Sequence, residues 1–224
     1  MLTVHHLNNS RSQRVLWLLE ELGVPYEIVR YQRQPDMRAP AVLRAIHPLG
    51  KSPVITDNGN TVAESGAIVE YIVDAYGEGR LIPPPKTPER LRYTYWLHYA
   101  EGSAMPPQLM KLIFDRVESG PMPFFIKPVA KAIAGRVKQA FILPQIKLHL
   151  DYLEAELSRH EWFVGSDFSA ADIQMSFPLE AAALRSGLNE SRPRLHAFLQ
   201  KIHARPAYAR ALEKGGQYDF APKQ

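Results

Sequence analysis

Three short polar loops hold the residues whose types could do chemistry. Two of them precede helix-like segments, and the free N–H groups and the dipole of a helix N-terminus favour anions. In a small sheet with helices on it, all three can lie along one edge. They are NNSRS at 8–12, HPLGKSP at 47–53 and VAESGA at 62–67. Together they predict a site for a small anionic ligand.

The middle loop adds the dipeptide Ser52–Pro53. An X–Pro bond is cis in only about one case in twenty, so either isomer is compatible with the sequence. If the bond were cis, Ser52 would present its N–H and C=O outward, and an extended peptide could pair with them. The ligand would then be a small, extended, peptide-like anion. The competing interpretation is that Ser10 and Ser65 have only the structural role of starting helices. If helix capping is the only evidence considered, this structural interpretation is favoured.

Several other chemistries are disfavoured by spacing. The GKS at 50–52 is not a P-loop, because Ala45 replaces the required glycine and Pro53 opens a strand rather than a helix. His5 and His6 are adjacent on a strand and therefore point to opposite faces. With no cysteine in the chain, we expect no metal site, no disulfide and no thiol nucleophile from the protein.

The composition is that of an ordinary globular protein, with 224 residues, of which 46% are hydrophobic and 22% charged. The formal charge is +4, but Lys and Arg are scattered along the chain. We therefore expect no nucleic-acid partner, which would need clustered basic residues. No apolar run approaches the ~20 residues that span a bilayer, and no signal segment is evident, so a cytoplasmic location is expected.

The elements that must position the loops change in type along the chain. The first part alternates strands and helices and ends in a hairpin with an Asn-Gly turn at 57–60. The order β-α-β-α-β-β-α predicts a small mixed sheet with helices on it. The predicted segments are 2–7, 11–22, 26–31, 39–46, 53–56, 61–63 and 64–76.

The second part predicts helices only. Three consecutive prolines make 79–88 a stiff linker, so we place one domain at 1–78 and an all-helical domain at 89–224. Pro106, Pro107 and Pro144 should bend or break the long helices that contain them. Ser169 and Asp172 form a capping box, worth about 1 kcal/mol.

A basic amphipathic stretch lies at 124–143. Such a stretch is typical of helices that dock on a membrane surface, but we expect its apolar stripe to pack against neighbouring helices.

The sequence resembles the cytosolic glutathione transferases over essentially its whole length. The resemblance is carried by NNSRSQRVLWLLEELGVPYE, HPLGKSPVI, TVAESGAIVEYI and FSAADI, in that order and spacing. VHHLNNSRS, YQRQPDMRAP and AIHPLGKSPV are most similar to a branch found in fungi and bacteria. The resemblance implies a thioredoxin-like α/β domain followed by an all-α domain, a homodimer, and a detoxifying enzyme that conjugates glutathione to electrophiles.

Residue by residue, the resemblance implies a glutathione site. Glu64 and Ser65 match the pair that holds the γ-glutamyl end, Pro53 matches the cis-proline, and Ser52 matches the residue whose backbone pairs with the cysteinyl unit. Lys51 lies where a side chain could meet the glycyl carboxylate. Glu101 is assigned to the γ-glutamyl amine of the partner subunit's glutathione.

The position that activates the thiol carries neither Tyr nor Cys. Ser10 is the best match, while the register also allows Asn9 and Ser12. A hydroxyl hydrogen bond and a helix N-terminus would both favour the thiolate.

The electrophile would lie against apolar side chains, for which we select Tyr99, Met105, Leu109, Phe124 and Phe220. The alternatives to conjugation are glutathione-dependent peroxide or disulfide reduction, and a binding module of this fold without turnover. The clustered aromatic residues Tyr93, Tyr95, Trp96 and Tyr99 are further taken to indicate a surface covered in a dimer.

Overall fold

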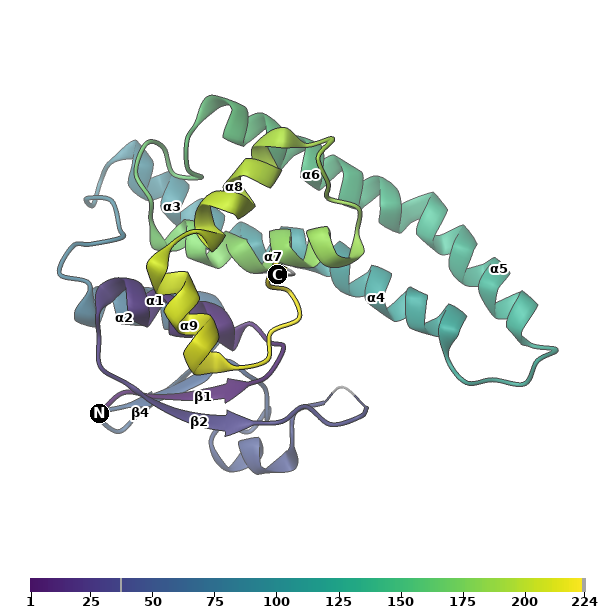
Figure 1. The fold of residues 1–224 in the computed structure, drawn as a ribbon, viewed down its shortest axis with the longest axis horizontal. Helices are drawn as coiled ribbons and strands as arrows, with labels where there is room; N and C mark the ends of the chain where they lie inside the picture. Colours follow the sequence, from purple (N-terminus) through teal and green to yellow (C-terminus); the bar gives the residue numbers. More distant parts are fainter. Residues whose placement is uncertain (37, 223–224) are drawn as a thin grey trace.

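The computed structural model describes residues 1–36 and 38–222, and its first part is built on a four-stranded sheet (Figure 1). The strand order is β2-β1-β3-β4. β1 pairs in parallel with β2 and antiparallel with β3, and β3 pairs antiparallel with β4. The predicted mixed sheet and its hairpin are confirmed. The strands are β1 Thr3–Leu7, β2 Glu27–Tyr31, β3 Val54–Asp57 and β4 Asn60–Ala63.

Two helices and one short turn complete this part. α1, Ser12–Leu22, is buried along nearly its whole length and ends at Gly23, whose φ of 67° provides the left-handed cap. α2, Ser65–Tyr76, follows β4 directly. The helix predicted at 39–46 is instead a 3₁₀ turn, η1 Ala41–Ala45, in which Leu43 is the buried residue.

The second part is helical, as predicted. Its elements are α3 Pro88–Tyr99, η2 Ala100–Ala104, α4 Met105–Ser119, α5 Lys127–Val137, η3 Lys138–Ile142, α6 Leu143–Arg159, α7 Ala170–Arg185, α8 Pro193–His203 and α9 Pro206–Gly215.

The prolines mark two breaks in helical geometry. Both η2 and η3 are π-helical turns, and each lies directly before a helix with proline in its first turn, Pro106 and Pro107 in α4 and Pro144 in α6. A proline ring collides with the carbonyl four residues earlier and cannot donate to it, so the preceding turn widens instead of continuing as an ordinary α-helix. The prediction of bent or broken helices at these prolines is confirmed.

The capping box at the start of α7 is also present. Asp172 accepts the Ser169 backbone N–H at 2.9 Å and the Phe163 backbone N–H at 2.9 Å. The helix start is therefore tied to the loop before it.

α4 and α5 form an arm that extends away from the sheet (Figure 1). On this arm Ile126, Val129 and Ile133 are 44%, 57% and 57% exposed. The expectation that this stripe packs against neighbouring helices is wrong for these side chains, because α5 contacts its neighbours through other faces, where Ala134 is buried.

The aromatic residues of α3 are mostly internal. Tyr93, Trp96 and Tyr99 are buried, and Tyr95 is 45% exposed. Trp96 packs between Tyr152 at 5.7 Å and Phe163 at 4.7 Å, measured between ring centroids. The idea that these residues form an open aromatic surface is therefore wrong for three of the four, because α6 and the loop after it cover them.

The last helix returns to the first domain, where α9 packs on α1 (Figure 1). The Trp17 ring of α1 meets the Tyr208 ring of α9 at 5.2 Å, and both belong to one buried cluster that runs through both parts of the chain. The division into domains at 78 and 89 stays a prediction. Within the part of the chain that the structure describes, no helix is both long and apolar enough to cross a bilayer.

Candidate active site

The ends of three strands meet at one edge of the sheet, and a cleft lies there. β1 and β2 both end at this edge, with Leu7 paired to Tyr31. β3 starts here, with Val54 paired to His5, so the segment before β3 runs beside the end of β1. The cleft has a volume of about 620 Å³ and is lined, among others, by Asn9, Ser10, Arg11, Arg33, Lys51, Ser52 and Phe177.

Ser10 lies in the turn between β1 and α1, is buried by the protein and lines the cleft. Its Oγ accepts the backbone N–H of Ser12 at 3.2 Å and lies 2.8 Å from the Ser12 Oγ. A serine hydroxyl that bonds to the N–H two residues later stabilises this kind of turn before a helix. This hydrogen bond fixes the position of the Ser10 Oγ at the N-terminus of α1.

Ser12 links Ser10 to a buried histidine. The Ser12 Oγ lies 2.9 Å from Nδ1 of His6 and also contacts the backbone of Leu7. Burial lowers the pKa of His6 to about 4, so the ring is neutral at pH 7. In the tautomer with a proton on Nδ1, His6 donates to Ser12 and Ser12 donates to Ser10, which leaves the Ser10 proton for a group in the cleft.

Asn9 is engaged elsewhere. Its Nδ2 donates to the Asp219 carboxylate at 2.8 Å, and its Oδ1 accepts the Asp219 backbone N–H at 2.7 Å. Its φ of 51° is a left-handed conformation that asparagine tolerates better than most residues. Asn9 therefore fastens the C-terminal tail across the end of the sheet. Asn9 and Ser10 both line the cleft, whereas Ser12 does not. Of these two, only Ser10 has a hydroxyl that can donate a proton to a ligand.

The segment before β3 supplies Lys51, Ser52 and Pro53. The Ser52–Pro53 peptide bond is cis, as the family resemblance implies. The Ser52 hydroxyl donates to the backbone carbonyl of His5 at 3.1 Å, which ties this segment to β1. Lys51 is exposed on the rim, and Pro53 is buried. Both Lys51 and Ser52 line the same cleft as Ser10.

Glu64 and Ser65 lie at the start of α2, outside the lining of that cleft. Glu64 is exposed and has a φ of 72°, which is uncommon for a residue with a side chain. Such conformations cost energy and cluster at functional sites. Its carboxylate acts electrostatically on Arg11, which does line the cleft, so the two groups belong to one neighbourhood.

Glu101 lies in the π-helical turn η2 and faces α1. It accepts from Nε of Arg11 at 2.9 Å and from the buried Arg14. Burial alone would raise the pKa of Glu101, but the charges of Arg14 and Arg11 outweigh it and lower the pKa. The carboxylate is therefore ionised at neutral pH and joins the helical part to α1.

Known proteins match this chain over nearly its full length. Residues 1–74 and 136–206 match the families described as Glutathione S-transferase, N-terminal domain, and Glutathione S-transferase, C-terminal domain. Glutathione S-transferase 3 of Schizosaccharomyces pombe is 36% identical over 214 residues, covering 96% of this chain and 88% of that protein. The chain belongs to the glutathione S-transferase family. Glutathione S-transferase 1 of Saccharomyces cerevisiae is 35% identical over 222 residues, covering 96% of this chain and 95% of that protein.

Solved glutathione S-transferases share the fold. One from Actinobacillus pleuropneumoniae is 31% identical with a TM-score of 0.79, covering 100% of this chain and 97% of that one. A glutathione transferase from Phanerochaete chrysosporium, solved in complex with oxidized glutathione, is 27% identical with a TM-score of 0.76, covering 96% of both chains. The predicted family, fold class and transferase type are confirmed.

The five residues selected for the electrophile divide into two groups. Met105 and Phe220 belong to a small buried cluster with Phe177, Ala181 and Tyr218, and Phe177 lines the cleft. The Phe220 ring lies 4.9 Å from the Phe177 ring. Two members of the prediction thus lie next to the cleft.

The structure does not bring the other three to the cleft. Tyr99 is buried, with its hydroxyl 2.6 Å from Nδ1 of His149. Leu109 is 51% exposed on α4, and Phe124 is 87% exposed in the loop between α4 and α5. That loop is at the far end of the arm in Figure 1. Apolar or aromatic character alone does not bring a side chain to the cleft, and helix packing directs these three elsewhere.

Sequence reasoning missed Phe177, Arg11 and Arg33, which all line the cleft. Phe177 lies inside a helix composed mostly of small and apolar residues, so its sequence neighbours do not distinguish it from a core residue. Arg11 stands between Ser10 and Ser12, where its position inside the polar loop before α1 was an available signal. No group of three or more His, Cys, Asp or Glu side chains is placed to hold a metal ion within residues 1–36 and 38–222.

Proposed function

We propose that this protein activates the thiol of glutathione and transfers it to small hydrophobic electrophiles. One observation carries the proposal in a chain of this family: the Ser10 hydroxyl lies in the same cleft as Lys51 and Ser52, directly before a cis-proline. A backbone edge suited to a peptide and a hydroxyl suited to a thiolate therefore lie together. Its relative from Phanerochaete chrysosporium was solved with oxidized glutathione.

Activation means stabilising the thiolate. A free thiol has a pKa of about 8.5 and is mostly protonated at neutral pH. The Ser10 hydroxyl would donate to the sulfur while its oxygen accepts the Ser12 N–H. The N-terminus of α1 adds a positive potential at the same place. Together the two effects could lower the thiol pKa by about one to two units.

Glutathione binding is assigned to the neighbouring loops. The backbone of Ser52 would pair with the cysteinyl unit, Lys51 would meet the glycyl carboxylate, and Glu64 and Ser65 would hold the γ-glutamyl end. The rare backbone conformation of Glu64 supports a functional position. Pro53, which is buried directly after Ser52, would hold the Ser52 backbone in place for this pairing.

Glu101 is assigned to contact with glutathione across the subunit interface. Its carboxylate would reach the γ-glutamyl amine of the partner subunit's glutathione in a homodimer. Within one subunit, its ion pairs with Arg11 and Arg14 also position the start of α1. The homodimer and the cytoplasmic location both stay predictions.

The reaction conserves atoms in a simple way. The thiol proton passes to solvent, the sulfur forms a bond to an electrophilic carbon, and a leaving group such as chloride departs with its electron pair. The Phe177 ring, with Phe220 and Met105 behind it, would provide the apolar wall for the electrophile.

Turnover tests the proposal. We expect glutathione-dependent conjugation of 1-chloro-2,4-dinitrobenzene above the uncatalysed rate. Faster consumption of cumene hydroperoxide, with oxidised glutathione as product, would assign the site to peroxide reduction instead. Glutathione binding by calorimetry without either turnover would favour a binding module. No glutathione binding at all would overturn the proposal.

A further inference from the structure

Arginine side chains gather around the aromatic wall of the cleft. The guanidinium carbon of Arg11 lies 5.2 Å from the centre of the Phe177 ring, and that of Arg185 lies 4.8 Å from the centre of the Phe220 ring. The two rings are 4.9 Å apart. Each ring of this aromatic pair therefore has a guanidinium close to it, Arg185 from α7 and Arg11 from the loop before α1.

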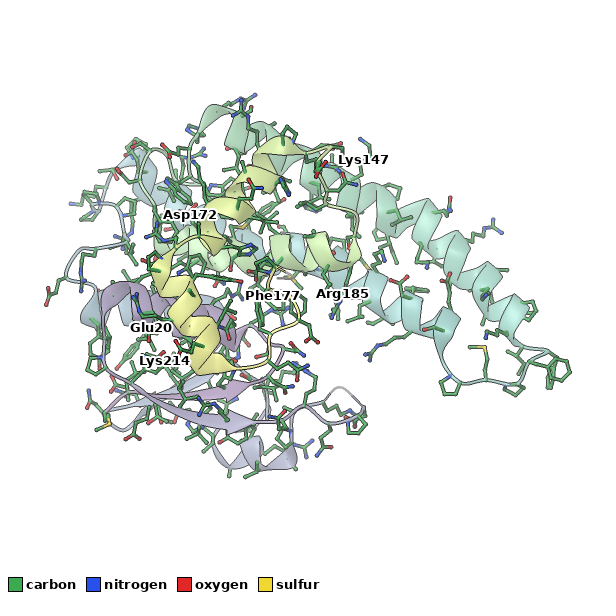
Figure 2. The ribbon with its side chains drawn as sticks, viewed as in Figure 1. Glu20, Lys147, Asp172, Phe177, Arg185 and Lys214 are labelled. Atoms are coloured by element: carbon green, nitrogen blue, oxygen red, sulfur yellow. The ribbon has the colours of Figure 1, made fainter. Side chains whose placement is uncertain are left out.

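α7 brings part of this arrangement to one face. Phe177, Ala181 and Arg185 follow at four-residue intervals, so their side chains lie on one side of the helix. Figure 2 shows Phe177 near the middle of α7 and Arg185 towards its C-terminal end. Phe177 and Ala181 pack with Tyr218 and Phe220 of the tail.

Two further arginines add charge. Arg33 lines the cleft, and one of its N–H groups donates to the Asn9 carbonyl at 3.1 Å. Burial and then the positive charges of Arg11, Arg185 and Arg116 lower the pKa of Arg33. Burial and the charge of Arg116 likewise lower the pKa of Arg185, against the opposite effect of Asp219. The positive charges of Arg11, Arg116 and Arg185 therefore reach Arg33, and that of Arg116 also reaches Arg185.

Negative charge in the neighbourhood is smaller, because the described residues that line the cleft include five basic residues and one acidic residue, Asp36. Glu101 pairs with Arg11 but is shared with Arg14. Asp219 is held by Asn9, and Glu64 acts electrostatically on Arg11. Bringing like charges together in a partly buried place is unfavourable, and a bound anion would relieve it. A guanidinium also binds carboxylates through two parallel hydrogen bonds.

We propose that this arginine cluster, Arg11, Arg33, Arg116 and Arg185, binds an acidic group of the second substrate. The preferred electrophile then has an aromatic or apolar body, which lies on Phe177, and a carboxylate, which meets the guanidinium groups. This inference rests on the proposed function and names its substrate class.

Glutathione itself does not account for the whole cluster. Its anchors are assigned to residues 51–53 and 64–65, whereas Arg185 and Arg116 belong to α7 and α4. Both helices belong to the helical part of the chain, and α4 packs against α7. Arg185 lies against Phe220 beside the aromatic wall, and the charge of Arg116 acts on Arg185, so we assign both to selection of the electrophile.

A matched pair of substrates isolates the charge. We would measure kcat/KM at saturating glutathione for 4-chloro-3,5-dinitrobenzoate and for its neutral carboxamide, each divided by its uncatalysed rate with glutathione. In both, sulfur replaces chloride on the ring, and chloride leaves with the bonding electrons. We expect the parent enzyme to favour the benzoate roughly tenfold, the size of one charge-assisted hydrogen bond in a partly exposed site.

Variants identify the source of the preference. Arg185→Gln should remove most of it, and Arg185→Lys should retain part because the charge remains. Arg116→Gln, at an exposed residue of α4, gives a second test if Arg185→Gln fails to fold. Arg159→Gln removes one positive charge on the last turn of α6, outside the cluster, and should keep the parent ratio.

The outcomes separate the two proposals. Turnover of both substrates without a preference for the benzoate, or a preference that survives both glutamine variants, overturns the inference and leaves conjugation standing. A preference that Arg159→Gln removes as well would reflect overall charge and also overturns it. No turnover of either substrate overturns the proposed conjugation and the inference with it.

Discussion

Replacing Ser10 by alanine tests the thiol-activation mechanism directly. The change removes the hydroxyl that would donate to the glutathione sulfur and leaves Lys51, Ser52, Glu64 and Ser65 in place. A hydrogen bond to a charged group contributes about 1.5–3 kcal/mol. Because one pKa unit corresponds to about 1.4 kcal/mol, the thiol pKa should rise by roughly one to two units. Turnover at neutral pH should fall by ~10- to 100-fold, with little change in glutathione affinity.

The structure adds a cost that must be measured separately. The Ser10 Oγ accepts the Ser12 N–H and contacts the Ser12 Oγ at 2.8 Å. Alanine leaves this N–H without its acceptor, so the free energy of unfolding should drop by about 1–2 kcal/mol. Urea unfolding of each variant shows whether the turn survives at the assay temperature.

The assay is the ultraviolet absorbance of the bound thiolate against pH, with the rate profile measured alongside. Asn9→Ala should titrate like the parent, because the Asn9 amide is bonded to Asp219. Ser12→Ala should raise the thiol pKa by less than Ser10→Ala does, because it only breaks the link from His6 to Ser10.

Two results would refute this reasoning. If Ser10→Ala titrates like the parent while Asn9→Ala shifts upward, the amide activates the thiol. If none of the three variants moves the curve, the N-terminus of α1 and backbone amides act alone.

Three further predictions concern binding, stability and assembly. Glu64→Ala should weaken glutathione binding by about 1.5–3 kcal/mol in calorimetry, and an unchanged affinity would remove Glu64 from the site. Burial raises the pKa of Asp172 to about 6, so the unfolded state releases this proton first. The Asp172 contribution to the free energy of unfolding should therefore fall as pH rises from about 3.8 to about 6, and parent and Asp172→Asn should differ in urea titrations across that window. Sedimentation should give about twice the chain mass of 25.4 kDa, whereas a single species at that mass would exclude the homodimer.

Local chemistry made the individual elements predictable. The stripe of Val15, Leu18, Leu19 and Leu22 defines a helix, and Gly23 ends it, because both effects depend on residues a few positions apart. The Asn-Gly turn and the capping box at Ser169 are local in the same sense. The prolines predict the breaks in the helices, because each break is caused by a clash between the proline ring and the turn directly before it.

The polar loop before α1 could also be recognised from the sequence as a candidate site, but which of its residues would activate a thiol could not. Asn9, Ser10 and Ser12 are all polar and lie within four positions, so no pattern separates them. They differ in their partners elsewhere in the chain: Asn9 is hydrogen-bonded to Asp219, and Ser12 is hydrogen-bonded to His6. Ser10 is distinguished only once the tail and the sheet are in place.

The wall of the cleft was decided by tertiary structure. Phe177 and Phe220 are 43 positions apart in the numbering and meet because the tail returns across α7, while Tyr99 and Phe124 are equally aromatic and lie elsewhere. The residues of the arginine cluster come from α4, α7 and two loops of the sheet. They are scattered along the sequence, so the sequence does not indicate that they lie close together. Composition and periodicity thus determined which segments form helices and strands, because those depend on neighbours along the chain. Which side chains share the cleft depended on packing between segments far apart in sequence.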